Sequence, residues 1–96
     1  MRPSIILAAH REAIRRIVAA HRAGDARVFG SVLRGSDTEF SDLDLLVEPT
    51  QEMTLLDIGA IRHELRQLLG VPVDVLTPGA LPERTRAQVL SEAEPV

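Results

Sequence analysis

The sequence predicts an α/β (α+β) fold class, a small mixed sheet flanked by helices, from three observations. Apolar residues recur at helical spacing in two long stretches, 4–22 and 54–69. Short runs rich in Val and Leu lie between and after them, bounded by glycine, proline and serine. Helical and strand patterns therefore alternate along the chain, which is typical of one sheet with helices packed on it.

The first stretch, residues 4–22, is expected to form one amphipathic helix. Ser4 can cap its N-terminus, and Gly24 follows its end. A short strand is expected next, over residues 26–29. The chain thus reaches its first candidate site residues directly after this strand.

A turn and a loop are expected after the first strand. Gly30 breaks the strand, and Ser31 can open a single helical turn that ends at Arg34. Residues 35–41, GSDTEFS, have the composition of a loop. A second strand is expected over residues 42–48, closed by a proline.

The second half of the chain predicts helix, strand and helix. The helix over 54–69 is the clearest, because its apolar residues form one stripe and Gly70 stands at the expected stop. A third strand is expected over 71–76 and a last helix over about 81–91. The tail EAEPV is expected to be frayed or to lie against a partner. The strand–helix–strand order favours a parallel second and third strand, whereas the first strand can pair antiparallel.

Two carboxylates interrupt the second strand, DLDLLVE. Successive strand residues point to opposite faces, so Asp42 and Asp44 share one face, about 6.6–6.8 Å apart along the strand. The apolar residues between and after them, Leu43, Leu45 and Val47, then share the other face and point to the core. A lone pattern of this kind is most often a solvated face.

A third carboxylate, Asp74, stands in the same relation to its strand, VPVDVLT. If the second and third strands pair in register, Asp74 joins Asp42 and Asp44 in one cluster. Such carboxylates repel one another, and Mg²⁺, which prefers carboxylate, water and phosphate oxygens, relieves the conflict. Two Mg²⁺ ions could then stabilise a phosphoryl displacement, with Asp74 as candidate base on the incoming hydroxyl.

The Gly-Ser turn favours the functional interpretation of these carboxylates. Gly30 lets the backbone approach a ligand without a Cβ in the way. Ser31 offers a hydroxyl where the first turn of a helix can face an anion. A phosphate cradle, two carboxylates and a third on the next strand together indicate phosphoryl-transfer chemistry.

Composition narrows the classes of function. The length, 96 residues, indicates one domain over 1–96. The net charge of −3 and the absence of Trp and Tyr argue against nucleic acid as the main partner. The chain has no cysteine, and its N-terminal apolar run is too short for a signal peptide or a membrane span. We therefore expect a soluble cytoplasmic protein without a membrane partner.

The motifs resemble a known family pattern. They are Phe29-Gly30-Ser31, Asp42-Leu43-Asp44-Leu45 and Val73-Asp74-Val75, and the stretch GSVLRGSDTEFSDLDLLV carries the first two. This combination is similar to the nucleotidyltransferase superfamily of DNA polymerase beta, and most closely to its minimal nucleotidyltransferases, often called MNT or MntA-like proteins. The resemblance covers nearly the whole chain and implies the polymerase beta-like nucleotidyltransferase fold.

The resemblance assigns roles to seven residues. It implies that Gly30 and Ser31 hold the nucleoside triphosphate, ATP, and that Asp42, Asp44 and Asp74 form the catalytic and metal site for Mg²⁺. Two further residues are counted with the nucleotide-binding set. The resemblance implies that Arg34 contacts phosphate or organises the loop. An equally good interpretation is that Arg34 is a surface arginine at the end of a helical turn. Ser41 most simply caps or braces the loop before Asp42.

The resemblance also implies a partner. Minimal nucleotidyltransferases are typically antitoxins of HEPN-family ribonuclease toxins, and some transfer AMP from ATP to a tyrosine of that toxin. The chain has no room for a second substrate domain, which agrees with a protein acceptor and a hetero-oligomer. Two alternatives stay open: an antitoxin that neutralises the toxin by binding alone, and a nucleotidyltransferase acting on a small molecule.

Overall fold

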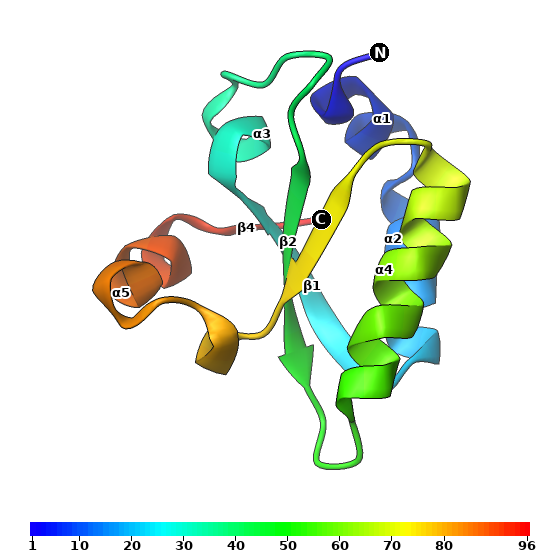
Figure 1. Cartoon of the computed structure of the whole chain (residues 1–96), viewed down its shortest axis with the longest axis vertical. Helices are drawn as coiled ribbons and strands as arrows, with labels where there is room; N and C mark the ends of the chain where they lie inside the picture. The colour runs from blue at the N-terminus through cyan, green and yellow to red at the C-terminus, as the bar shows by residue number, and fades with distance from the viewer.

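A four-stranded sheet with the order β3-β2-β1-β4 organises the computed structural model, which describes residues 1–96 (Figure 1). The strands are β1 (Ala23–Phe29), β2 (Leu43–Pro49), β3 (Val73–Leu76) and β4 (Glu94–Pro95). β1 pairs antiparallel with β2, and β2 pairs parallel with β3. Both pairing directions confirm the predictions from the sequence, as does the mixed α+β class.

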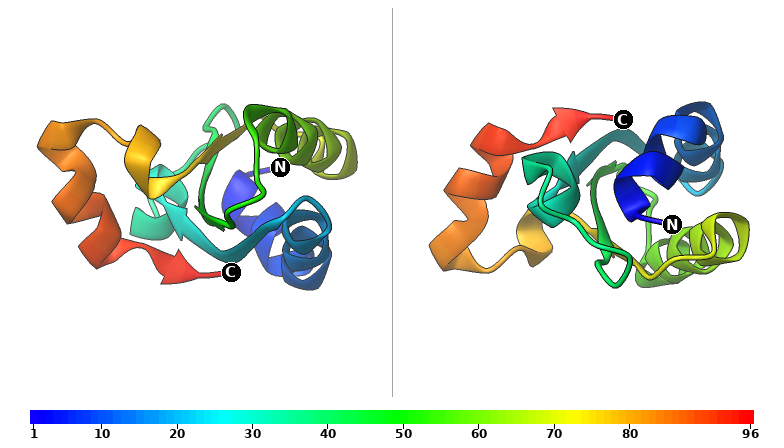
Figure 2. Two further views of the ribbon diagram at one scale, coloured as in Figure 1. Left: turned by 90° about the horizontal axis from the view of Figure 1, so that it is seen from below. Right: turned by 90° about the horizontal axis from the view of Figure 1, so that it is seen from above.

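Five α-helices and one short 3₁₀ helix surround this sheet. They are α1 (Pro3–Ala9), α2 (Arg11–Ala20), α3 (Gly30–Arg34), α4 (Leu55–Leu69), η1 (Pro78–Ala80) and α5 (Glu83–Glu92). Helices α1, α2 and α4 lie on one side of the sheet, and α5 lies on the opposite side (Figures 1 and 2). None of the helices combines the length and the apolar character needed to cross a membrane.

The core lies between the sheet and helices α2 and α4. Leu43, Leu45 and Val47 are each fully buried, which confirms that these alternate residues of β2 share the core face. Ile14 of α2 and Ile61 of α4 are fully buried in the same apolar cluster. The other face of β2 carries Asp44 and the fully buried Leu46, so strand alternation separates Asp44 from the core that α2 and α4 cover.

Helix α4 begins and ends as the sequence predicts, but its buried stripe is narrower. Thr54 forms a capping box with Asp57, and Gly70 ends the helix at φ 70°. Ile61, Leu65 and Leu69 are the buried residues, whereas Leu68 is 44% exposed. Leu68 is adjacent to Leu69 and so lies about 100° around the helix from it, outside the stripe that faces the sheet.

The single helix expected over residues 4–22 is wrong, because the chain breaks at His10. His10 has φ −128° and ψ 22°, outside helical values, and its ring Nδ1 lies 3.0 Å from the backbone oxygen of Ile6. The break lets α1 turn away from α2 while Leu7 is still buried. Ser4 does not cap this helix either, since Pro3 begins it after Arg2.

The C-terminal tail is ordered on the sheet, so the expectation that it frays or lies against a partner is wrong. β4 pairs antiparallel with β1, with Arg27 opposite Pro95 and Val28 opposite Glu94. Val96 donates its N–H to the backbone oxygen of Ala26 at 2.9 Å and is only 6% exposed. The outer position suits Pro95, because an edge strand tolerates a residue without an N–H donor.

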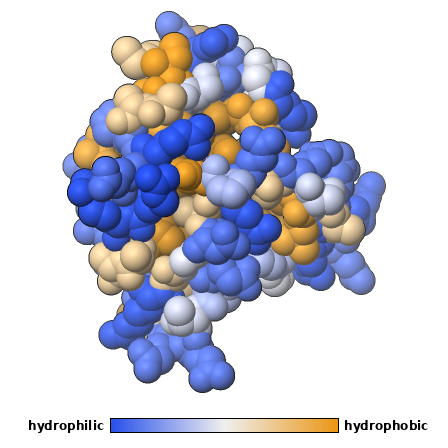
Figure 3. Space-filling model, turned by 180° about the vertical axis from the view of Figure 1, so that it is seen from behind, coloured by the Kyte–Doolittle hydropathy of each residue, from blue (hydrophilic) through white to orange (hydrophobic).

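The surface seen from behind mixes hydrophilic and hydrophobic residues (Figure 3). Apolar residues show through in several separate places rather than as one broad area on this face (Figure 3). Scattered apolar surface of this kind is normal for a folded domain.

Burial of Val96 gives a test of the tail's role in stability. We expect Val96→Ala to lower the free energy of unfolding by about 1.5 kcal/mol, because two buried carbon groups are lost. Urea unfolding followed by circular dichroism measures this change. The exposed neighbour Glu94 supplies the control, since Glu94→Ala should change stability by less than about 0.5 kcal/mol. Equal effects of the two substitutions would show that the tail is not docked.

Candidate active site

The turn between β1 and α3 places a glycine directly against a carboxylate. Gly30 has φ +77°, a conformation that side chains rarely adopt. A Cβ at Gly30 would overlap Asp44 Oδ2 and come within 3.2 Å of Asp44 Cγ. Two features that are separate in sequence, the Gly-Ser turn and the strand carboxylates, therefore meet at this point and require glycine.

Three side chains form a row across three neighbouring strands. Asp44 of β2 stands opposite Phe29 of β1 on one side and opposite Asp74 of β3 on the other. This is the register predicted for Asp74. Asp44 is partly buried, whereas Asp74 is exposed. Asp42 precedes the first residue of β2, and its side chain is exposed as well. The carboxylates lie on the face that α2 and α4 leave uncovered.

The surroundings of Asp44 disfavour its ionised form. Burial, followed by the negative charges of Asp74 and Asp42, raises the pKa of Asp44 from 3.8 to about 6. The positive charge of Arg34 acts in the opposite direction on the same pKa. The charges of Asp42, Asp74 and Arg34 therefore all lie close enough to Asp44 to act on its pKa.

The carboxylates do not converge into one metal-ligating group. No three His, Cys, Asp or Glu side chains in the structure lie together as a set that could hold a metal ion. This differs from the expected cluster of Asp42, Asp44 and Asp74. Like charges repel one another, which disfavours close convergence of these carboxylates. The donor set is nevertheless of the all-oxygen kind that Mg²⁺ prefers, so the residues fit this ion chemically.

Ser41 braces the loop that leads to Asp42. The hydroxyl of Ser41 accepts a hydrogen bond from the N–H of Thr38 at 2.8 Å. The N–H of Ser41 in turn donates to the backbone oxygen of Thr38 at 3.1 Å. The Ser41 hydroxyl therefore has a structural partner, and its assignment to nucleotide binding stays a prediction. Arg34 ends α3 with an exposed side chain, free to meet a ligand.

Asp37 anchors the same loop and was not singled out from the sequence. Its side chain is only 3% exposed, and Oδ2 accepts the N–H of Ser4 at 2.9 Å. Burial alone would raise the pKa of Asp37, but hydrogen bonds from Ser4 and the charge of Arg2 outweigh it, so this pKa is lowered. The contact joins residues far apart in sequence, and no local pattern indicates it.

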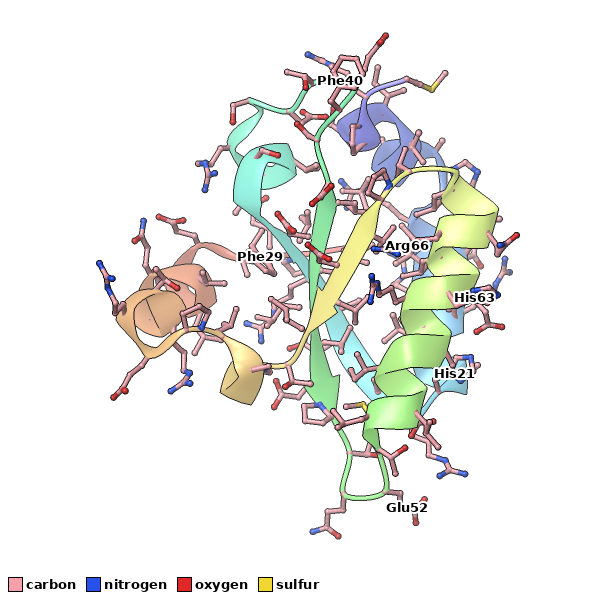
Figure 4. The ribbon with its side chains drawn as sticks, viewed as in Figure 1. His21, Phe29, Phe40, Glu52, His63 and Arg66 are labelled. Atoms are coloured by element: carbon pink, nitrogen blue, oxygen red, sulfur yellow. The ribbon has the colours of Figure 1, made fainter.

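Phe29 is a second residue that sequence reasoning left out of the site. It stands beside Gly30 and in the row of Asp44 and Asp74, and its side chain lines a groove between α3 and α5 (Figure 4). The hydrophobic position before Gly-Ser in the motif was the available signal. The groove itself could not be predicted from the sequence, because α5, which forms its other wall, contains no site motif.

A family comparison decides the class of protein. The family model described as "Nucleotidyltransferase domain" matches residues 7–95. The chain belongs to this family. It is a nucleotidyltransferase, as the motifs predict, and the four-stranded sheet with its flanking helices is the nucleotidyltransferase fold.

Relatives of known sequence or structure agree with this assignment. A Methanocaldococcus jannaschii protein named "Putative protein adenylyltransferase" is 38% identical over 77 residues, covering 80% of this chain and 83% of its own length. The protein adenylyltransferase MntA of Thermococcus cleftensis is 34% identical over 87 residues, covering 91% and 85%. A solved structure described as a "putative minimal nucleotidyltransferase" is 47% identical, with a TM-score of 0.86 and coverage of 97% and 95%.

A more distant structure shares the fold alone. A toxin-antitoxin complex with AMP-PNP contains a chain that is 15% identical, with a TM-score of 0.71. The match covers 97% of this chain and 71% of that one. The architecture is therefore retained while most of the side chains differ.

Gly30 and Gly35 form a matched pair for testing the close approach to Asp44. Both have positive φ, +77° and +73°, but a Cβ at Gly35 would meet nothing within 4 Å. We expect Gly35→Ala to cost about 1–2 kcal/mol of backbone strain. Gly30→Ala should cost more and also displace the Asp44 carboxylate. Urea unfolding and a structure of each variant measure both effects, and equal costs without movement of Asp44 would contradict the account.

The raised pKa of Asp44 can be tested by measuring how the free energy of unfolding depends on pH. Because folding raises the pKa of Asp44 from 3.8 to about 6, ionisation disfavours the folded state increasingly as the pH rises through this range. Without divalent cations, Asp44→Asn should therefore raise the free energy of unfolding at pH 8 by about 1 kcal/mol, after allowance for solvent screening at this partly exposed position. The difference from the native chain should shrink toward pH 4.

Glu52 supplies the control for this test, since it lies exposed in the turn at the far end of the molecule (Figure 4). Glu52→Gln should leave the dependence of stability on pH unchanged. If Asp44→Asn destabilised the chain at pH 8, the carboxylates would not repel one another as described.

Proposed function

We propose that this chain transfers AMP from ATP to a hydroxyl group of a partner protein. The single observation that carries the proposal is the row of Asp44 and Asp74 beside the Gly30 turn. Two relatives named as protein adenylyltransferases, 38% and 34% identical over most of their length, support a protein acceptor.

The proposed roles follow from where each residue lies. The triphosphate would lie against Gly30, whose missing Cβ leaves its backbone accessible, with the Ser31 hydroxyl and Arg34 as donors to phosphate oxygens. Asp42, Asp44 and Asp74 would hold Mg²⁺, two ions in the full site. When bound, the ions neutralise the carboxylates and the charge that develops on the phosphate oxygens.

The chemical step would exchange a phosphoanhydride bond of ATP for a phosphate ester bond to the acceptor. The acceptor oxygen forms a bond to the α-phosphorus of ATP, and the bond from that phosphorus to the bridging oxygen of pyrophosphate breaks. Asp74 is the proposed acceptor of the hydroxyl proton, since it is exposed at the edge of the row where another protein can reach it. The products are the AMP-modified protein and pyrophosphate.

The raised pKa of Asp44 supports a cation at this place. Burial and the nearby charges of Asp74 and Asp42 raise the pKa of Asp44 to about 6. A divalent cation held by these carboxylates would favour their ionised forms.

The proposed partner is a HEPN-family ribonuclease toxin, modified on a tyrosine and thereby neutralised. This finer statement follows from the resemblance of the motifs to MntA-like antitoxins, and ATP as donor would place the reaction in the cytoplasm. The two proteins would form a hetero-oligomer, at least during transfer.

A second candidate function is neutralisation of the toxin by binding alone. It is favoured by the uneven charge of the chain, since residues 1–34 carry about +5 and residues 35–96 about −8, which suits docking to a charged partner surface. Transfer to a small-molecule acceptor is a third candidate, which turnover without any partner protein would support.

The test is a transfer assay with ATP labelled at the α-phosphate, Mg²⁺ and the toxin encoded by the adjacent gene. We expect label on the toxin, and we expect Asp42→Asn combined with Asp44→Asn to reduce labelling at least about a hundredfold by removing metal ligands. Glu52→Gln is the control and should label normally. Undiminished labelling by the double variant would contradict the proposed site.

A binding assay separates transfer from occlusion. If the double variant still binds the toxin but no longer suppresses its ribonuclease activity, chemistry is required. If the double variant binds and suppresses the toxin fully, occlusion is the function and the proposed transfer is wrong.

A further inference from the structure

Phe40 is the most exposed of the large apolar side chains, with 91% of its surface accessible to solvent. Phenylalanine is among the residue types that are most often buried. The other phenylalanine of the chain, Phe29, is only partly exposed. The roles proposed for the carboxylates and for the Gly-Ser turn make no use of Phe40, so its exposure needs another explanation.

Hydrogen bonds hold the loop that presents Phe40. Phe40 lies at the tip of a turn in which the N–H of Ser41 donates to the backbone oxygen of Thr38 at 3.1 Å. The N–H of Phe40 itself donates to the hydroxyl oxygen of Thr38 at 3.2 Å. The buried Asp37, which accepts the N–H of Ser4, ties the start of the turn to α1. Because the loop is already ordered, it loses little conformational freedom when it binds a partner.

Phe40 stands next to the candidate active site. Asp42, the first of the three carboxylates, follows it by two residues and is exposed as well. Figure 4 shows Phe40 at one end of the molecule and Glu52 at the other. A protein that covered Phe40 would therefore stand beside the carboxylates to which the proposed function brings an acceptor hydroxyl.

Charge narrows what could cover Phe40. Its neighbour Glu39 is exposed and forms no ion pair within the chain. A second copy docked by the same face would bring the carboxylates of both copies near one another, and their like charges would repel. An anionic membrane surface would meet the same repulsion. A protein surface with an apolar recess and basic side chains at its edge would complement both Phe40 and Glu39.

We propose that Phe40 anchors the acceptor protein by inserting into an apolar recess, bordered by basic side chains, near the accepting hydroxyl. The inference rests on the proposed function, because it requires a protein acceptor. Aromatic side chains are frequent among the few residues that dominate the binding energy of an interface. The loop over residues 35–41 thereby gains a role of its own, which is to place the acceptor beside the carboxylates.

The test measures binding of the partner and of the nucleotide separately. Calorimetry measures binding of the whole chain to the toxin encoded by the adjacent gene, and to a non-hydrolysable ATP analogue with Mg²⁺. We expect Phe40→Ala to weaken binding of the toxin at least about thirtyfold, a loss typical of an aromatic anchor. Phe40→Leu, which keeps an apolar side chain, should lose less. Binding of the ATP analogue should not change in either variant.

The charge of the recess has its own variant, Glu39→Lys. It should slow association with the toxin at least about fivefold at low salt, because a charge at the edge of an interface acts chiefly on the association rate. Surface plasmon resonance measures this rate. Unchanged or faster association would overturn the basic character of the recess.

Leu56→Ala is the matched control, since Leu56 is 85% exposed near the start of α4 and should bind both ligands normally when replaced. Equal binding of the toxin by the native chain and by Phe40→Ala, or no binding by the native chain, would overturn the proposal. An equal loss of the ATP analogue would assign Phe40 to the nucleotide, and a native dimer that Phe40→Ala dissociates would assign it to a second copy; either result would overturn the proposal. A native chain that binds the toxin through Phe40 but transfers no AMP would contradict the proposed function and support the docking surface.

Discussion

The site depends on one close approach, between the backbone of Gly30 and the carboxylate of Asp44. A Cβ at position 30 would overlap Asp44 Oδ2, and the positive φ of Gly30 turns the chain from β1 into α3 at the same point. Only glycine meets both demands without strain. The Gly-Ser turn and the strand carboxylates are therefore one structural unit, although thirteen residues separate Gly30 from Asp44 in the chain.

The sheet supplies the rest of the arrangement. Alternation along β2 sends Leu43, Leu45 and Val47 into the core and leaves Asp44 on the opposite face. Parallel pairing with β3 sets Asp74 opposite Asp44, and antiparallel pairing with β1 sets Phe29 there too. The pKa of Asp44 is raised to about 6, first by its burial and then by the charges of Asp74 and Asp42.

Features governed by local periodicity could be predicted from the sequence, and features governed by distant contacts could not. Strand alternation follows from the spacing of residues and was predicted correctly. The register that sets Asp74 opposite Asp44 was a condition of the expected cluster, and the structure meets it. The pairing of β4 with β1 and the hydrogen bond from Ser4 to Asp37 join segments far apart in the chain, and no local sequence pattern predicts such contacts. The helix break at His10 was likewise not predicted, because the apolar spacing of residues 4–22 continues across it. The groove beside α5 belongs to the second group, because its two walls meet only in the folded chain.

The central claim is that burial and the neighbouring carboxylates disfavour ionisation of Asp44 in the free chain, and the proposed function adds that a cation would bind there. A titration of the Asp44 side-chain carboxyl carbon by nuclear magnetic resonance, with and without Mg²⁺ and a non-hydrolysable ATP analogue, tests it directly. The account predicts a pKa of about 6 in the free chain and a clear fall in this pKa when both ligands are added. An ordinary pKa in the free chain, or one that does not move when the ligands are added, would contradict it.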